Sequence, residues 1–205
     1  MTPYKTLYVK TRKQWRDWLI DNFDEAKEIW LVYPKLNTGK IRIVYNDAVE
    51  EALCFGWIDS TVKTLDKNHI IQRFTTRNPK SDYSQANKER LKWLLDKNLI
   101  YPPLEKNVRD IISRKFVFPP DIINAIKNDK TTWNNYQKFS DSYKRIRIAY
   151  IEGARKRPDE FKKRLSNFLD KTRENKLIKG FGGIDKYYLN NCRQCNMALP
   201  SAARG

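Results

Sequence analysis

The chain has 205 residues, of which 40% are hydrophobic and 13% aromatic, a composition that supports a packed core and excludes a wholly disordered protein. Its formal net charge is +17, which favours polyanionic partners or serves solubility alone. No apolar run approaches the roughly 18–20 residues that span a bilayer, and the first residues lack the apolar region of a secretory signal, so we expect a cytoplasmic protein without a transmembrane segment.

The first quarter of the chain mixes strand-like and helix-like patterns. Thr11, followed by Gln14, forms a capping box, and the apolar residues after it recur at helical spacing: Trp15, Trp18, Leu19 and Phe23. Apolar and β-branched runs predict strands at 7–9, 29–33 and, after a turn at 37–39, 41–45. Asn46 or Asp47 is expected to cap the next helix, which Gly56 would end.

Two more strands and a helix complete the predicted front half. The runs Trp57–Leu65 and Ile70–Arg77 flank turn residues 66–68, as the arms of a hairpin do. Ser84 is expected to cap a helix whose apolar face carries Leu91 and Leu94. This order of elements predicts an α+β fold with a mostly antiparallel sheet and flanking helices, and it does not match repeated βαβ units.

The rear half shows only helical patterns. Proline pairs at 102–103 and 119–120 break the chain. A short helix is predicted between them, with Leu104, Val108, Ile111 and Ile112 on its apolar face, and Asp121 begins the next helix. Pro158 suits the first turn of the last helix, where Asp159 and Glu160 would favour the helix dipole. We therefore expect an α+β domain over 1–115, an all-helical C-terminal domain over 116–190 and a flexible tail over 191–205.

Several strings resemble one family, the YdeI/OmpD-associated proteins of bacteria. They are IWLVYPKLNTGK (29–40), ALCFGWIDS (52–60), RFTTRNPKSDYSQANKER (73–90), DSYKRIRIAYIEGARKRPDEFKKRL (141–165) and GFGGID (180–185). The resemblance spans about residues 7–186. It implies a YjbR/CyaY-like front half, a helical C-terminal region and a link to bacteriocin or antimicrobial-peptide protection. It implies neither a defined reaction nor catalytic residues.

A candidate anion site lies where the last predicted strand passes into the following helix. Even spacing puts Arg73 and Arg77 on one strand face, and the helix start at Ser84 offers unpaired N–H groups. Guanidinium groups, hydroxyls and free N–H groups together suit a phosphate or carboxylate. The complete candidate set is Arg73, Arg77, Lys80, Ser81, Ser84 and Asn87. The alternative is that Ser84 only caps the helix and the arginines pair with nearby acids.

Trp57 and Asp59 join this candidate site because alternation puts them on one face of the neighbouring strand. Asp59 could hold Arg73 or Arg77 across the hairpin as a structural ion pair. It could also act as a general base, a role that requires a cleft and a raised pKa.

Other catalytic or metal chemistry finds little support. His69 stands alone at a turn, so a nucleophilic triad is not indicated. Cys54 follows apolar helical positions and fits a buried thiol. Cys192 and Cys195 form a lone CxxC, whereas a structural zinc site needs about four ligands. We therefore expect no metal and no cofactor.

The second half is the more basic one. Residues 142–179 contain 13 Lys/Arg and 5 Asp/Glu, and several of the cations lie outside the apolar positions: Lys144, Arg147, Arg155, Lys162, Lys163 and Lys171. Such a surface could follow a phosphate backbone, although no recognition-helix, RNP or zinc-finger motif accompanies it. A solvated basic face is one alternative, and binding of these helices to a membrane surface is a third reading.

Together these observations favour a non-enzymatic binding protein for an anionic ligand, with a role in stress or antimicrobial-peptide protection. Nucleic-acid binding through the basic rear helices is one alternative. An enzyme that acts on a small phosphorylated substrate, with Asp59 as the base, is the other. The sequence predicts neither the ligand nor the oligomeric state.

Overall fold

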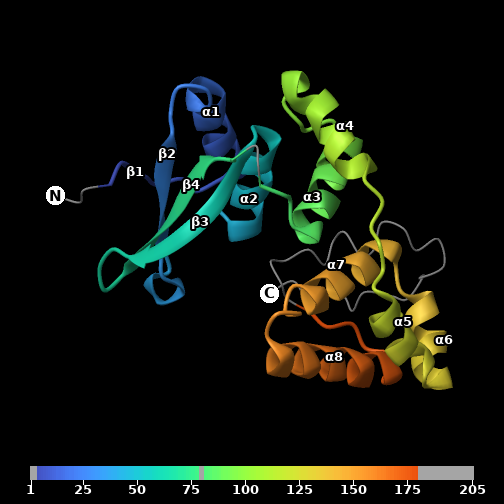
Figure 1. Ribbon diagram of the computed structural model, residues 1–205. Coiled ribbons are helices and arrows are strands. Elements are labelled where there is room, and N and C mark those ends of the chain that lie inside the picture. The colour runs from blue at the N-terminus through green and yellow to red at the C-terminus, as the bar shows by residue number, and fades with distance from the viewer. Residues whose placement is uncertain (1–3, 79–80, 180–205) are drawn as a thin grey trace, which may run out of the picture. The chain divides into compact units, whose positions relative to one another are not determined.

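The computed structural model describes residues 4–78 and 81–179. It divides into two compact units, Met1–Lys115 and Phe116–Gly205. Figure 1 shows a mixed first unit with a sheet and helices, and a second unit in which the described elements are helices. The predicted α+β class with a helical C-terminal region is confirmed. The tail predicted over 191–205, with Cys192 and Cys195, lies outside the described residues.

The first unit is built on a four-stranded sheet with strand order β1-β2-β4-β3. The strands are β1 (Thr6–Leu7), β2 (Glu28–Pro34), β3 (Trp57–Thr64) and β4 (His69–Thr76). Only β1 and β2 pair in parallel within the described sheet, and the other pairings are antiparallel, so the sheet is mostly antiparallel as predicted. In the central pair, Trp30 of β2 lies opposite Arg73 of β4.

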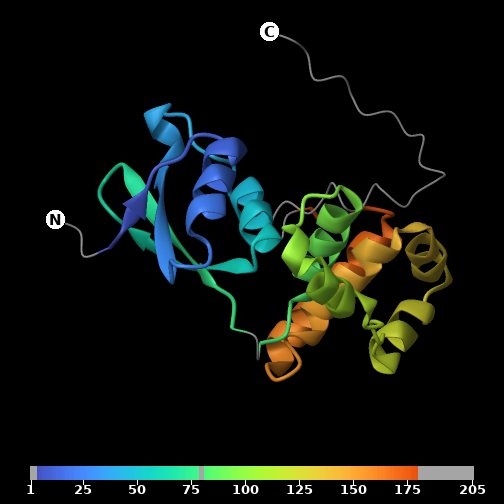
Figure 2. The same ribbon diagram turned by 90° about the horizontal axis from the view of Figure 1, so that it is seen from above.

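Four α-helices accompany the sheet among the described residues of this unit: α1 (Arg12–Asn22), α2 (Tyr45–Cys54), α3 (Gln85–Asp96) and α4 (Glu105–Ser113). Two 3-10 turns, η1 (Leu36–Thr38) and η2 (Pro102–Leu104), lie before α2 and α4. Thr11 caps α1 as predicted, because its side chain accepts a hydrogen bond from the Gln14 N–H. Figure 2 shows α1 and α2 side by side along one face of the sheet.

The core of the first unit forms between this helix pair and the sheet. Trp15 and Leu19 of α1 are fully buried, and Ile29, Leu31 and Phe74 meet them from the strands. Burial of each such side chain contributes about 1.5–3 kcal/mol. The indole N–H of Trp15 donates to the carbonyl of Ala48 at 3.0 Å, which links α1 to α2.

A buried ion cluster also joins α1 to α2. Arg12 donates to Glu51 at 2.5 and 2.8 Å, to Glu50 at 2.8 Å and to Asp47 at 3.1 Å. Arg16 donates to the other oxygen of Glu51 at 2.8 Å. The side chains of Glu50 and Glu51 are 0% and 4% exposed, so their charges require these partners.

The predicted strand at 41–45 is wrong. Residues 39–44 form a loop, and α2 begins at Tyr45. Gly39, at φ +65°, turns the chain, and Ile43 is buried while its N–H donates to the Val9 carbonyl at 3.2 Å. The alternation of apolar residues therefore places one side chain inward on a loop rather than a whole strand face. The first strand is shorter than the predicted 7–9 and begins one residue earlier.

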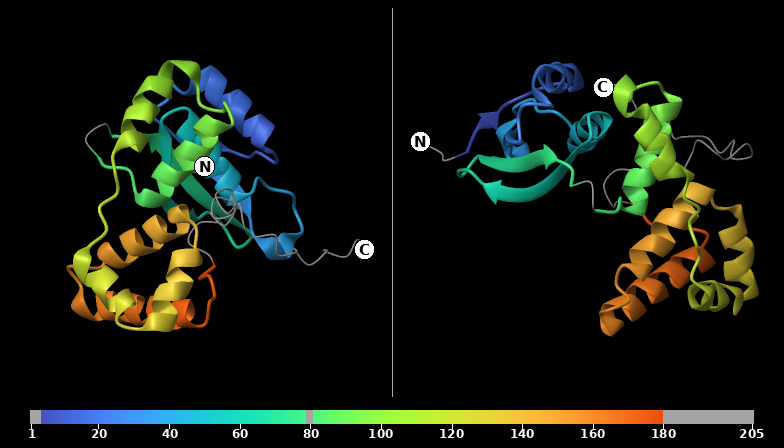
Figure 3. Two further views of the ribbon diagram at one scale, coloured as in Figure 1. Left: turned by 90° about the vertical axis from the view of Figure 1, so that its right-hand side faces the viewer. Right: turned by 45° about the horizontal axis from the view of Figure 1, so that its top comes forward.

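The second unit contains α5 (Pro120–Lys127), α6 (Lys130–Lys138), α7 (Asp141–Glu152) and α8 (Pro158–Arg173). Asp129 and Ser140 cap α6 and α7, and Pro158 occupies the first turn of α8 as predicted. Tyr143 and Phe168 are buried where α7 and α8 pack side by side (Figure 3). None of the described helices has the length and apolar character to cross a membrane.

Candidate ligand pocket in the α+β unit

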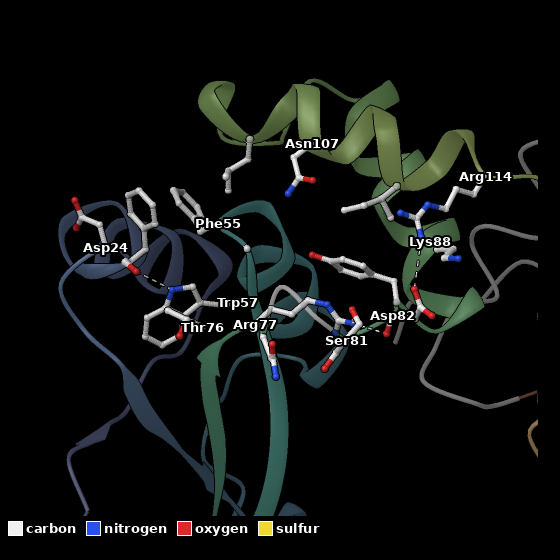
Figure 4. A pocket seen from close by; sticks show the side chains of 16 residues that line it. Asp24, Phe55, Trp57, Thr76, Arg77, Ser81, Asp82, Lys88, Asn107 and Arg114 are labelled. Atoms are coloured by element: carbon white, nitrogen blue, oxygen red, sulfur yellow. Dashed lines mark hydrogen bonds and ion pairs between the residues drawn. The ribbon is translucent and has the colours of Figure 1, made fainter.

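A pocket of about 450 Å³ lies in the first unit, beside the end of β4. Figure 4 shows Trp57 and Arg77 on one side of it and Asn107 of α4 on the other. Three predicted site residues line this pocket: Trp57, Arg77 and Ser81. A volume of this size is typical of small-molecule sites, which span about 300–1,000 Å³.

The apolar wall of the pocket comes from segments far apart in sequence. Trp57, the first residue of β3, is buried, and its indole N–H donates to the Phe23 carbonyl at 2.9 Å. Phe23 and Phe55 pack with ring centroids 5.4 Å apart. Gly56 between Phe55 and Trp57 has φ +73°, a conformation that a residue with a Cβ adopts only with strain. From α4 and the turn before it, Ile111 and Leu104 complete the wall.

Arg77 is held in a fixed position at the pocket. Its backbone N–H donates to the Gly56 carbonyl at 3.0 Å. Its Nη2 donates to the carbonyls of Ser81, at 2.8 Å, and Asp82. The guanidinium carbon lies 3.7 Å from the centre of the Tyr83 ring, a close cation–π contact. Burial raises the pKa of the Tyr83 hydroxyl, and the charge of Arg77 opposes this shift.

One donor of Arg77 is buried without an acceptor. No group in the described part of the chain accepts a hydrogen bond from its Nε. A buried donor left in this way costs about 1–3 kcal/mol, so the site gains from any acceptor that reaches it.

The other charges at the pocket are mixed, with an excess of cations. Lys88 and Arg114 add positive charge, and Asp24 and Asp82 add negative charge. Arg114 pairs with Asp82 at 3.6 Å, and both side chains are highly exposed, so this contact is weak. With Arg77 included, three cations face two carboxylates.

The predicted convergence of Arg73 with Arg77 is wrong. Arg73 lies in the interior of β4 and forms an ion pair with Glu28 on the neighbouring β2. A hydrogen bond from Arg73 and, to a smaller extent, one from Trp30 lower the pKa of Glu28. Arg73 is therefore neutralised on the sheet and does not line the pocket.

The predicted helix-start site is also absent from the pocket lining. Ser84 caps α3, since its hydroxyl accepts a hydrogen bond from the Asn87 N–H at 3.3 Å. The Asn87 side chain accepts from Arg90 at 2.7 Å. Neither residue lines the pocket, so the capping alternative describes Ser84 correctly. Lys80 lies outside the described residues.

Asp59 does not hold either arginine. Its carboxylate accepts a hydrogen bond from the Tyr45 hydroxyl. Burial, and then this hydrogen bond, raise the pKa of Tyr45. Asp59 is not among the residues that line the pocket, which removes the geometric basis for its role as a base there.

The sulfhydryl and imidazole groups do not form a reactive site among the described residues. Burial raises the pKa of Cys54 to about 12, which keeps the thiol protonated at neutral pH. His69 bonds to Asp66 within the β3–β4 turn. No group of three or more His, Cys, Asp or Glu side chains in the described ranges could hold a metal ion.

The basic residues predicted to follow a phosphate backbone do not form a free stripe. Arg147 is 4% exposed. Arg155 pairs with Asp121 and Glu152. Two further cations have acidic neighbours, Lys144 with Asp141 and Lys171 with Glu174. Lys162 and Lys163 are the exposed members of the predicted set that form no ion pair with a described residue.

Sequence reasoning missed most of the pocket. Five lining residues were not predicted, because their spacing along the chain does not show that they meet: Phe55, Tyr83, Lys88, Asn107 and Arg114. Leu104 and Ile111 lie seven residues apart, the spacing of one helix face, but this pattern equally fits a core.

The comparisons with known proteins divide the chain as the fold does. Residues 7–106 match the model of a domain of unknown function (DUF8412). Residues 115–175 match the family described as "Bacteriocin-protection, YdeI or OmpD-Associated". No curated protein and no solved structure matches the chain. The family resemblance is thus supported over the helical unit and not over the predicted 7–186, and the YjbR/CyaY-like relation of the front half stays a prediction.

Proposed function

We propose that this protein is a binding protein whose α+β unit takes a small organic anion in the pocket beside Arg77. The observation that carries the proposal is the state of Arg77. Its Nη2 donates to two backbone carbonyls, and its guanidinium carbon lies 3.7 Å from the centre of the Tyr83 ring. Its buried Nε has no acceptor among the described residues. A guanidinium group held in this way is preorganised for a carboxylate or phosphate oxygen.

The rest of the lining defines the other part of the ligand. Phe55 and Trp57 present aromatic carbon, so an apolar, preferably planar, body would pack there while the anionic group approaches Arg77. Lys88 lies on the same pocket and adds to the positive field. A simple inorganic anion would leave the aromatic wall without a partner.

The physiological setting that we propose is bacteriocin protection in the cytoplasm. Support for the protective role comes from residues 115–175 and the description of the family that they match. The pocket lies in the other unit, whose matching family carries no functional description. We therefore assign the ligand chemistry from the pocket and the biological role from the helical unit.

The proposal is tested with 2-naphthoate and its uncharged analogue 2-naphthamide, by isothermal titration calorimetry on the full chain. We expect naphthoate to bind at least tenfold more tightly than the amide. Arg77→Ala should remove that preference, because a hydrogen bond to a charged group contributes about 1.5–3 kcal/mol, or roughly 10- to 100-fold in affinity.

Arg73→Ala is the matched control. It removes the same kind of side chain four residues earlier, within β4. The Arg73 guanidinium is paired with Glu28 outside the pocket, so naphthoate affinity should stay within about twofold. Lys88→Gln provides a second pocket variant in case Arg77→Ala disturbs the Ser81–Asp82 segment. Equal loss in the Arg73 and Arg77 variants, or no preference for the anion, would refute the proposal.

A further inference from the structure

The loop between β2 and α2 carries apolar side chains that point to solvent. Leu36, Ile41 and Val44 are 84%, 70% and 60% exposed, and all three lie within the segment 35–44, called here the β2–α2 loop. Isolated exposed hydrophobic side chains are common on proteins. Three exposed aliphatic side chains on one short loop form an apolar cluster, and such a cluster indicates an interaction site.

The exposure of these side chains is fixed by an ordered backbone. The Thr38 hydroxyl donates to the Lys35 carbonyl at 2.7 Å, and Gly39 ends the 3-10 turn in the left-handed conformation. The Tyr8 hydroxyl donates to the Ile41 carbonyl. Ile43 is buried and anchors the loop, so its neighbours on the loop are held outward. In Figure 1 this loop follows the lower end of β2.

The same loop is cationic. Residues 29–46 contain Lys35, Lys40 and Arg42 and no Asp or Glu. Within the described part of the chain neither lysine forms an ion pair, and Arg42 donates to the Pro34 carbonyl at 2.7 Å, which leaves its charge uncompensated. The β3–β4 turn is adjacent to the loop, because the Asn68 carbonyl accepts a hydrogen bond from the Lys35 N–H. This turn adds one lysine and one aspartate.

We infer that the β2–α2 loop is a docking surface for an anionic lipid membrane. Its cations would contact lipid phosphates, and Leu36 and Ile41 would enter the boundary between headgroups and acyl chains. Basic residues beside exposed aliphatic side chains are the combination that interfacial membrane binding requires. A stable protein interface, by contrast, needs about 800 Å² on each partner, which is a large area for a ten-residue loop.

This attachment would be peripheral, and it does not depend on the pocket in the same unit. Each Lys or Arg near an anionic surface strengthens association about fivefold, and the gain falls as salt screens the charges. The net charge of +17 would draw the whole chain toward the same surface. The β2–α2 loop would then be the part of the protein that contacts the lipid.

The test uses flotation of the full chain with vesicles of phosphatidylcholine alone or with one quarter phosphatidylglycerol, at 0.15 M salt. We expect binding only to the anionic vesicles. The double variant Leu36→Gln/Ile41→Gln should weaken it about tenfold or more. Ile20→Gln, at an aliphatic side chain of α1 that is 53% exposed, is the matched apolar control and should bind like the parent.

A pair of charge variants separates the loop from the net charge. Lys35→Gln/Lys40→Gln should weaken binding about 25-fold, whereas Lys162→Gln/Lys163→Gln, with the same charge change on α8, should weaken it less than about threefold. Equal losses in the two charge pairs, or unchanged binding of Leu36→Gln/Ile41→Gln, would overturn the inference, as would no binding to either vesicle. Sedimentation showing a dimer that this apolar variant dissociates would make the partner a second copy, and would also overturn it.

Discussion

The ion cluster between α1 and α2 predicts a large loss of stability when one carboxylate is neutralised. Glu51 is 4% exposed on its side chain and accepts hydrogen bonds from Arg12 and Arg16. Glu51→Gln keeps the shape but removes the charge, and it turns an amide N–H group toward guanidinium donors. Breaking a buried ion pair costs about 3–5 kcal/mol. Because the arginines are about one-third exposed, water screens part of this, and we expect about 2–3 kcal/mol.

The assay is thermal unfolding followed by tryptophan fluorescence. Five of the six tryptophans lie in residues 1–115, so the signal mainly reports the α+β unit. For a domain of this size 1 kcal/mol corresponds to roughly 4 °C, so Tm should fall by about 8–12 °C. Glu105→Gln makes the same change in an exposed pair with Arg109 and should shift Tm by no more than about 2 °C. If Glu51→Gln lowers Tm as little as Glu105→Gln, the reasoning is refuted.

Three further predictions concern single positions. Gly56→Ala should destabilise the α+β unit by about 1–2 kcal/mol in urea unfolding, because φ is +73° and a residue with a Cβ is strained there. The added Cβ would meet nothing closer than 3.5 Å, so the cost comes from the backbone and not from a clash. A neutral effect would contradict the assigned backbone. Ser140→Ala should remove the cap of α7 and lower the stability of the helical unit by about 1 kcal/mol by calorimetry, with an unchanged transition as the contrary result. Burial raises the pKa of Cys54 to about 12, so this thiol stays protonated at pH 8; the test uses a Cys192→Ser/Cys195→Ser background, in which Cys54 is the remaining cysteine. A disulfide reagent should therefore label it only after unfolding, and rapid labelling of the folded protein would contradict its burial.

Local patterns predicted the strand pair that a short turn joins, but they also predicted one strand that does not form. The hairpin of β3 and β4 was predicted because apolar runs flank a short turn, and a turn fixes which strands become neighbours. The strand predicted at 41–45 failed because alternation in a short segment does not reveal whether a partner strand is present. Here Tyr8 and Val9 contact the segment at single points, and no ladder forms.

The candidate site was predicted only where its residues are close in the chain. Trp57, Arg77 and Ser81 line the pocket because β3 begins beside the end of β4. Arg73 was assigned wrongly, since its partner Glu28 lies 45 residues away and is brought near by the register of β2 and β4. Lys88 and Arg114 reach the pocket through helix packing, which leaves no mark in the spacing of charges.

The pocket is formed by five stretches that are separated along the chain: the end of α1, the exit from α2, the end of β4 with the segment after it, the first turns of α3, and α4 with the turn before it. A bound ligand would therefore contact all of these stretches at once and stabilise them together. Partial opening of any one of them would have to release the occupant first. Amide protons in all five stretches should then exchange with solvent more slowly when the pocket is filled, and they should slow together, although the stretches are not adjacent in the sequence.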